Sequence, residues 1–106
     1  MRILFDQGTP VPLRRFLGEH QIRTAFELDW GHLSNGQLLD QAEAEGFEVL
    51  ITTDQNLKYQ QNLGNRQISI LVLSTTSWPR IQKVTADILA GINSLKPGDY
   101  LEIQIP

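Results

Sequence analysis

Apolar residues occur along the chain in five short runs, each closed by polar or turn-forming residues. Short, nearly continuous apolar runs are typical of strands that are buried on both faces of a sheet. The last run differs, because Leu101, Ile103 and Ile105 alternate with polar residues, which predicts an edge strand with one face in water. We therefore expect strands over residues 2–5, 22–26, 47–52, 68–73 and 100–105.

Signals for helices lie between these runs. Ser34 and Gln37 form the Ser-x-x-Gln pattern of a capping box, and Gly46 provides a stop after the apolar stripe that follows. A long amphipathic pattern with three- and four-residue spacing precedes the last strand. We expect helices between Pro10 and Gly18, from Ser34 to Gly46, from Asp54 to about Asn62, and from about Ser77 to Leu95.

The alternation of strands and helices predicts an α/β fold, a three-layer α/β/α sandwich with a mostly parallel sheet. The length of 106 residues fits a single domain over residues 1–106. Ligands of such sheets bind beyond the carboxyl ends of the strands, where the strand order reverses. The residues that follow the predicted strands are therefore the first candidates for a site.

Composition narrows the class of protein. Hydrophobic residues make up 41% and charged residues 20%, as in an ordinary globular domain. The absence of cysteine from the sequence excludes disulfides, zinc ribbons and thiol nucleophiles. No apolar run approaches the roughly 18 residues of a membrane span, and the first residues lack a secretion signal. We expect a cytoplasmic protein without a membrane partner.

Charge is distributed unevenly along the chain. Residues 24–54 contain seven acidic residues and no lysine or arginine, whereas the segments on either side are net basic. The overall net charge of −3 argues against nucleic-acid binding through a general basic surface. The acidic segment is either part of a cation site or a solvated surface, and the sequence leaves both interpretations open.

Asp6 and Asp54 are the leading candidates for chemistry, because each follows a predicted buried strand. If the two strands are neighbours, both carboxylates lie at one edge of the sheet, where they can bind Mg²⁺ or Mn²⁺. Such a metal can activate water and neutralise a phosphate, as phosphodiester hydrolysis requires. Each aspartate also has a purely structural interpretation, Asp54 as a helix cap and Asp6 as a turn residue before Gly8.

Amides, hydroxyls and basic residues accompany the two aspartates. Amides and hydroxyls bind phosphate, ribose or base edges, or simply face solvent. The candidates of this kind are Gln7, Thr9, Asn35, Gln37, Thr52, Thr53, Gln55, Asn56, Gln60, Gln61 and Asn62. Candidates for phosphate contacts are Arg14, Arg15, Lys58 and Arg66, and candidates for stacking on bases are Tyr59 and Trp30.

Three segments resemble a known family. Residues 4–10 (LFDQGTP), 33–36 (LSNG) and 50–57 (LITTDQNL) are similar to small PIN-like proteins related to toxin ribonucleases, and 59–63 (YQQNL) resembles one branch of that group. The resemblance spans nearly the whole chain. It implies a three-layer fold, an acidic Mg²⁺ or Mn²⁺ pocket and single-stranded RNA as the substrate. An acid after the first strand of that family matches Asp6, and an acid after a later strand matches Asp54.

The sequence departs from the family pattern around these aspartates. Many relatives carry acids where this chain has Asn35 and Gln37, and a second acid where it has Asn56. Asp40 and Glu43 lie one and two turns further along the same predicted helix. A typical site of the family uses three or four carboxylates, so fewer carboxylates here imply weaker metal binding.

Three functions remain open, ranked in this order. The first is a metal-dependent endoribonuclease, the toxin of a toxin–antitoxin pair, in which Asp6 and Asp54 hold the metal while Asn35 and Asn56 position water or phosphate. The second is a catalytically degenerate PIN-like module that binds RNA or a protein. The third is a signalling receiver domain, whose phosphorylated aspartate also ends the third strand, although no lysine ends the last strand here. The edge strand and the last helix also suit a homodimer.

Overall fold

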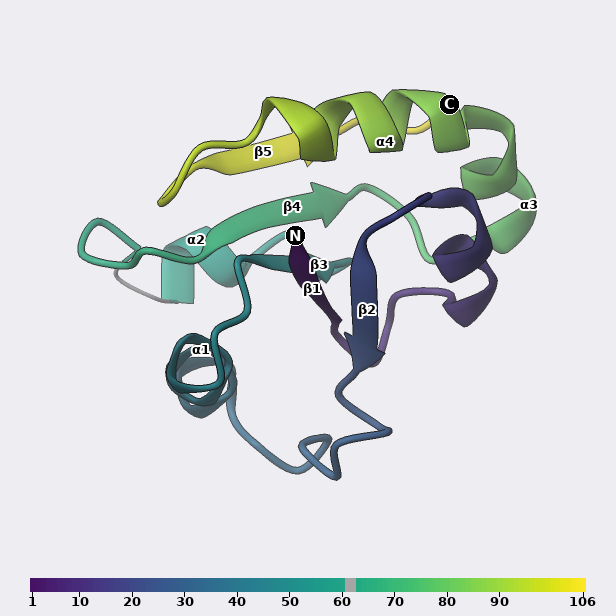
Figure 1. The fold of residues 1–106 in the computed structure, drawn as a ribbon. Coiled ribbons are helices and arrows are strands. Elements are labelled where there is room, and N and C mark those ends of the chain that lie inside the picture. Colours follow the sequence, from purple (N-terminus) through teal and green to yellow (C-terminus); the bar gives the residue numbers. More distant parts are fainter. Residues whose placement is uncertain (61–62) are drawn as a thin grey trace.

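The computed structural model describes residues 1–60 and 63–106, and over these residues the chain forms a five-stranded, fully parallel sheet (Figure 1). The strands are β1 (Arg2–Phe5), β2 (Gln21–Thr24), β3 (Val49–Thr52), β4 (Ser69–Leu73) and β5 (Tyr100–Ile103). Their order across the sheet is β2-β1-β3-β4-β5, so β5 lies at an edge, as its alternating pattern predicted. The three-layer α/β/α arrangement is confirmed.

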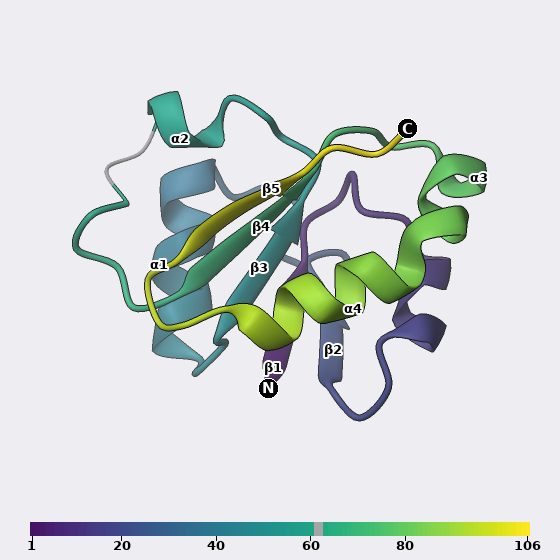
Figure 2. The ribbon, with the colours of Figure 1, turned by 90° about the horizontal axis from the view of Figure 1, so that it is seen from above.

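Helices cover both faces of the sheet. They are the 3₁₀ helix η1 (Val11–Phe16), α1 (Asn35–Ala44), α2 (Leu57–Gln60), α3 (Trp78–Ile81), the 3₁₀ helix η2 (Gln82–Val84) and α4 (Thr85–Ser94). Seen from above, α4 and α1 lie on opposite sides of the sheet (Figure 2). Among the described residues, no helix is both long enough and apolar enough to cross a membrane.

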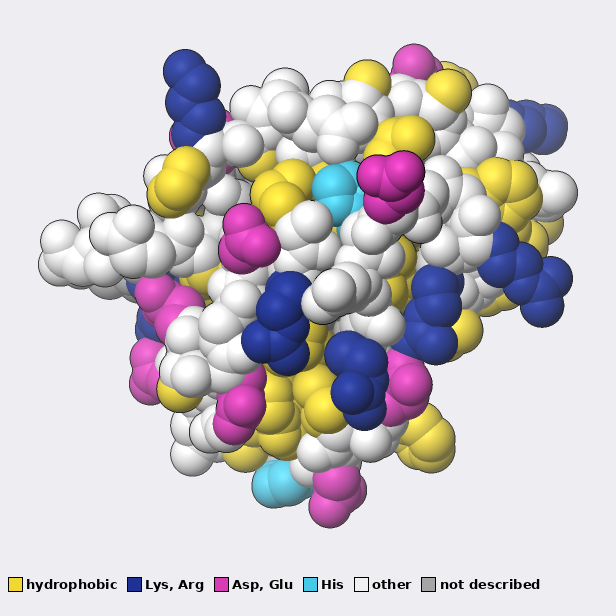
Figure 3. All heavy atoms as spheres, in the orientation of Figure 1, with side chains coloured by type: hydrophobic (Ala, Val, Ile, Leu, Met, Phe, Trp, Pro, Cys, Tyr) yellow, Lys and Arg dark blue, Asp and Glu magenta, His cyan; other side chains and the backbone are white. Residues whose placement is uncertain are grey.

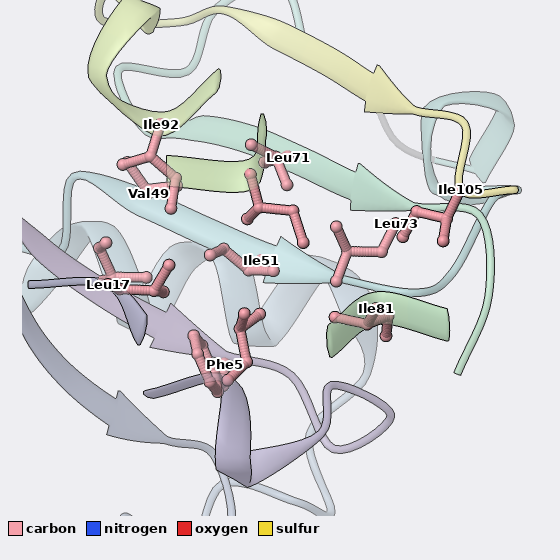
Figure 4. Packing of buried hydrophobic residues seen from close by; sticks show 12 residues of the cluster. Phe5, Leu17, Val49, Ile51, Leu71, Leu73, Ile81, Ile92 and Ile105 are labelled. Carbon is pink, nitrogen blue, oxygen red and sulfur yellow. The ribbon is translucent and has the colours of Figure 1, made fainter. Parts of the chain in front are cut away.

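The central strands are apolar on both faces because each face packs against its own helices. Ile3, Phe5 and Ile51 belong to a cluster with buried residues of η1, α3 and α4, which Figure 4 shows from close by. Leu4, which lies between Ile3 and Phe5, and Leu50, which precedes Ile51, point to the opposite face and belong to a cluster with α1 and α2. This two-sided burial explains why the runs in the sequence are continuous rather than alternating.

The capping signals around α1 are confirmed. The backbone N–H of Gln37 donates to Ser34 Oγ at 3.3 Å, and the N–H of Ser34 donates to Gln37 Oε1 at 3.0 Å. Gly46 has a φ of +81°, which glycine adopts without strain, and α1 ends shortly before it at Ala44. The capping box fixes the first turn of α1, which carries Asn35.

The second strand ends earlier than the apolar pattern predicted, at Thr24 instead of Phe26. The N–H of Thr24 donates to Glu27 Oε1, and the N–H of Glu27 donates to Thr24 Oγ1, both at 3.0 Å. This reciprocal pair turns the chain at Ala25, so it cannot continue along the sheet. Phe26 is left 81% exposed.

The last predicted helix is interrupted. Residues 77–95 form α3, η2 and α4 rather than one continuous helix. Val84 leaves helical geometry, with a φ of −127° and a ψ of 25°, where the β-branched residues Val84 and Thr85 follow each other. The apolar stripe is nevertheless buried as predicted, since Ile81, Ile88 and Ile92 have no exposed surface.

The helix predicted from Asp54 begins later, at Leu57. The N–H of Asn56 donates to Asp54 Oδ1 at 2.9 Å, so Asp54 closes a turn ahead of α2 instead of capping its first residue. The predicted end of this helix near Asn62, and the candidate amides Gln61 and Asn62, lie outside the described residues. β1 has the predicted bounds, and the other strand boundaries agree with the prediction to within two residues.

The polar side of β5 is half-buried, not open to water as predicted. Lys58 Nζ lies 3.0 Å from Glu102 Oε1, and the Tyr100 hydroxyl donates to the same oxygen at 3.1 Å. The pKa of Tyr100 is raised to about 12, mainly by burial and to a smaller extent by the hydrogen bond to Glu102. On the apolar side α4 packs closely, because a Cβ at Gly91 would lie 3.2 Å from Leu101 and Ile103.

Candidate functional site

The strand order reverses between β1 and β3. The chain places β2 on one side of β1, and β3, β4 and β5 on the other. In open parallel sheets, ligands bind at the carboxyl ends of the strands at this point. Asp6 follows β1 directly and Asp54 comes two residues after β3, so both candidate residues lie at the position where the topology favours a site. β1 and β3 are neighbours in the sheet, which is the condition under which both carboxylates lie at one edge.

The segments that follow these two strands are held against each other. The N–H of Asp6 and the hydroxyl of Thr9 both donate to the carbonyl oxygen of Ile51, at 3.0 and 2.9 Å. Gly8 passes so close to the segment after β3 that a Cβ there would lie 2.3 Å from Thr53 Oγ1. The turn at residues 6–9 therefore has a fixed position relative to residues 51–54, and a side chain at residue 8 would displace the hydroxyl of Thr53.

A buried hydroxyl connects the two aspartates. Thr52 Oγ1 donates to Asp6 Oδ2 at 2.9 Å and accepts from the N–H of Asp54 at 3.1 Å. Thr52 has no exposed surface, so water does not compete for these bonds. Sequence reasoning counted Thr52 as one hydroxyl among several. Its signal was present, because Thr52 is the polar last residue of an otherwise apolar buried strand.

Further hydrogen bonds orient each carboxylate. The amide nitrogen Nδ2 of Asn35, in the first turn of α1, donates to Asp54 Oδ2 at 3.1 Å, and the N–H of Asn56 donates to Asp54 Oδ1. The N–H of Gln7 donates to Asp6 Oδ1 at 2.8 Å. A carboxylate has about four acceptor positions. Both groups are thus fixed in place and keep acceptor capacity for a cation.

The donor set suits Mg²⁺ or Mn²⁺ with few protein ligands. Hard cations of this kind bind through one or two carboxylates and retain several waters. The described residues contain no group of three or more His, Cys, Asp or Glu that could hold a metal, so Asp6 and Asp54 are without a third acid there. The site differs in this respect from the three or four carboxylates that the family resemblance implies.

Asp40 and Glu43 are engaged elsewhere. Arg66 Nη1 lies 2.9 Å from Asp40 Oδ1 and 2.6 Å from Glu43 Oε1. The N–H of Gln67 also donates to Glu43, at 3.1 Å. This ion-paired cluster ties α1 to the segment before β4, which explains both why the two acids do not join the aspartates and why Arg66 is committed within the fold.

Several other candidate residues from the sequence make contacts within the fold, through hydrogen bonds or an ion pair that do not involve the two aspartates. Thr9 is buried with its hydroxyl on Ile51, so it holds the loop. Gln55 Nε2 donates to the carbonyl oxygen of Ser74 at 3.2 Å, linking the segments after β3 and β4. Lys58 is ion-paired with Glu102 on β5. The exposed side chains among the candidates include Gln7, Arg15 and Tyr59.

A cavity of about 520 Å³ extends from Asp6 toward the end of β2. Its lining includes Asp6, Gln7, Val11, Arg14, Phe26 and Glu27. Sequence reasoning identified Arg14 but missed Phe26 and Glu27, because Phe26 was assigned to a strand. The Thr24-x-x-Glu27 spacing was the available signal, because two residues at this spacing can exchange side-chain-to-backbone hydrogen bonds.

Arg14 is paired within this cavity. Its guanidinium forms an ion pair with Glu27, and this hydrogen bond lowers the pKa of the Glu27 carboxyl. On the face shown in Figure 3, Lys and Arg side chains are interspersed with Asp and Glu side chains. As far as the described residues show, this face has no continuous basic surface, in agreement with the net charge of −3.

Comparison of the chain with protein-family models, with curated proteins and with solved structures finds no match in any of the three.

Proposed function

We propose that this protein is a metal-dependent phosphodiesterase of PIN-like type that cleaves single-stranded RNA. The observation that carries the proposal is the pairing of Asp6 and Asp54 at the β1/β3 reversal through the buried hydroxyl of Thr52. A polar network that is buried and satisfied fixes the geometry of its members. Carboxylates fixed in this way favour the interpretation as a cation site over the interpretation as a solvated acidic surface.

Asp6 and Asp54 would hold Mg²⁺ or Mn²⁺. The ion, when bound, supplies a nucleophilic water near neutral pH and neutralises charge on the phosphate. Thr52 keeps the Asp6 carboxylate in position, while Asn35 and the Asn56 N–H do the same for Asp54. Outer partners of this kind commonly decide the affinity of a metal site.

RNA as the substrate, an antitoxin as the partner and the cytoplasm as the location are parts of the same proposal. The family resemblance supports the substrate and the partner, and the absence of cysteine from the sequence favours the location. In the structure, the exposed side chains of Arg15 and Tyr59 suit phosphate contact and base stacking. Because the chain has a net charge of −3, we expect RNA to bind through the metal site and through base stacking, and not through charge attraction alone.

Cleavage of a labelled single-stranded RNA by the purified protein with Mn²⁺ tests the proposal. The wild type should cut, whereas Asp6→Asn and Asp54→Asn should not, with urea unfolding showing that both variants still fold. Asp87→Asn, an exposed acid in the first turn of α4, is the matched control and should cut like the wild type. Cleavage that survives in both site variants would refute the proposal.

A second function, binding without catalysis, is favoured by one observation. The Asn35 amide donates a hydrogen bond to Asp54 at the position where relatives carry an acid. The Asp54 carboxylate is thereby already partly satisfied, and no third acid joins the two aspartates within residues 1–60 and 63–106. RNA or protein binding that needs no metal and persists in Asp54→Asn, together with absent cleavage, would establish this alternative.

A further inference from the structure

The cavity beside Asp6 is continuous with the proposed metal site. Asp6 lines its wall, and the cavity extends from there toward Phe26 and the Arg14–Glu27 ion pair. A second hollow of about 310 Å³ shares Gln7 and Phe26 with it, so these two side chains stand between two depressions of one groove. A polymer whose phosphate lies at Asp6 would therefore have its neighbouring unit in this groove.

The net negative charge of the cavity of about 520 Å³ favours an uncharged ligand group over a phosphate. Asp6 and Glu27 are acidic and Arg14 is basic, so its ionisable lining groups sum to −1. The only lining guanidinium among the described residues is already ion-paired with Glu27, and Glu27 also accepts from the N–H of Thr24 at 3.0 Å. A phosphate would meet net repulsion there, whereas an uncharged heterocycle would not.

The wall of the cavity presents an exposed aromatic ring. Phe26, which is 81% exposed, and Val11, which is 54% exposed, both line the cavity. The turn that carries Phe26 is held by backbone hydrogen bonds, among them Trp30 N–H to the Ala25 carbonyl at 2.8 Å. The backbone that carries the ring is therefore already ordered before a ligand binds.

The same wall presents an amide. The Gln7 side chain lies against Gly31, where a Cβ would come within 2.1 Å of Gln7 Nε2. Glycine at position 31 thus permits this placement. An amide offers both a donor and an acceptor to the edge of a base.

We propose that this cavity is a nucleobase subsite, in which the base next to the cleaved phosphodiester stacks on Phe26 and bonds to the Gln7 amide. The volume of about 520 Å³ falls in the range of small-ligand sites. The subsite rests on the proposed RNA cleavage, and it assigns base recognition to residues outside the carboxylate pair. It requires an unstacked base, which single-stranded RNA supplies.

Fluorescence anisotropy in EDTA tests the subsite without metal or cleavage. The probes are a labelled single-stranded RNA of mixed sequence and an abasic oligomer of equal length and charge. The wild type should bind the RNA more tightly than the abasic oligomer. Phe26→Leu should raise the Kd for RNA about tenfold and leave the Kd for the abasic oligomer unchanged, because stacking contributes at the level of single bases.

Two further variants make the result specific. Phe26→Tyr keeps the ring and should bind RNA like the wild type, and Phe16→Leu changes an exposed ring that packs on Trp78 outside the cavity and should have no effect. Equal binding of RNA and abasic oligomer, or equal loss in Phe26→Tyr and Phe26→Leu, would overturn the subsite. If ring-dependent binding is found without cleavage, the nuclease proposal alone fails; if cleavage is found without ring-dependent binding, the subsite alone fails.

Discussion

The hydroxyl of Thr52 donates a hydrogen bond of 2.9 Å to Oδ2 of Asp6, across two neighbouring strands. The hydroxyl oxygen of Thr52 also accepts from the backbone N–H of Asp54 at 3.1 Å. The carboxylate of Asp6 and the backbone of Asp54 are thereby linked through the side chain of Thr52, which has no exposed surface. A carboxylate pair with a shared internal support is a better metal site than two acids that face solvent independently.

Replacement of this hydroxyl should damage the site more than the fold. Thr52→Val keeps the shape of the side chain but leaves the Asp54 N–H without this acceptor, at a cost of about 1–3 kcal/mol in the free energy of unfolding. Mn²⁺-dependent RNA cleavage should fall about 10–100-fold, as for other outer partners of metal ligands. Thr52→Ser retains the oxygen and should stay near wild-type activity. Full activity in Thr52→Val would show that the bridge is irrelevant to the reaction.

The contact between Gly8 and Thr53 gives a prediction on stability. Gly8→Ala places a methyl group 2.3 Å from Thr53 Oγ1 and should lower the free energy of unfolding by about 1–3 kcal/mol. Thr53→Ala removes that oxygen, and the double variant should recover most of the loss, since the next contact is an ordinary 3.7 Å. Urea unfolding of the four proteins measures the coupling. Additive effects would mean that the two loops are not packed as described.

Asn35→Asp tests whether the missing acid limits the site. The change removes the donor to Asp54 and brings a second negative charge beside it, so the metal-free variant should be less stable than the wild type. A third carboxylate should strengthen Mn²⁺ binding roughly tenfold, because affinity rises with the number of charged ligands. Calorimetric titration with Mn²⁺ measures this. Unchanged or weaker binding would place the metal away from Asn35.

The environment of Tyr100 predicts a dependence of stability on pH. Its pKa is raised to about 12, above the value of about 10 for an exposed tyrosine, so the neutral form stabilises the fold. That contribution is fully present below about pH 10 and is lost as the pH rises through about 12. Tyr100→Phe should therefore lose less stability over this interval than the wild type, as followed by urea unfolding at each pH. A parallel decline in both proteins would contradict this assignment.

Much of the fold could be predicted from the sequence because its signals are local. The capping box of Ser34 and Gln37 and the two-sided apolar runs each depend on a few adjacent residues. The end of β2 could not be predicted from apolarity, because the side chains of Thr24 and Glu27 outweigh the preference of Phe26 for a strand. The break at Val84 was likewise hidden, since the apolar spacing runs through it.

The site was predicted in part. Asp6 and Asp54 were identified because each follows a predicted buried strand, at the edge where ligands of parallel sheets bind. The support that Thr52 gives to Asp6 depends on which strands are neighbours, and local spacing does not show this. The cavity around Phe26 depends on a turn whose one local signal was the Thr24-x-x-Glu27 spacing. Lys58 was misleading for the same reason, because its partner Glu102 is far away in the sequence.

Binding of Mn²⁺ to the purified protein, followed by the loss of the electron paramagnetic resonance signal of the free ion, tests the central claim most directly. The wild type should bind Mn²⁺, Asp6→Asn and Asp54→Asn should each weaken binding by at least about tenfold, and Asp87→Asn should bind like the wild type. Equal affinity in the wild type and both site variants, or no binding by the wild type, would contradict the assignment of these two carboxylates as one metal site.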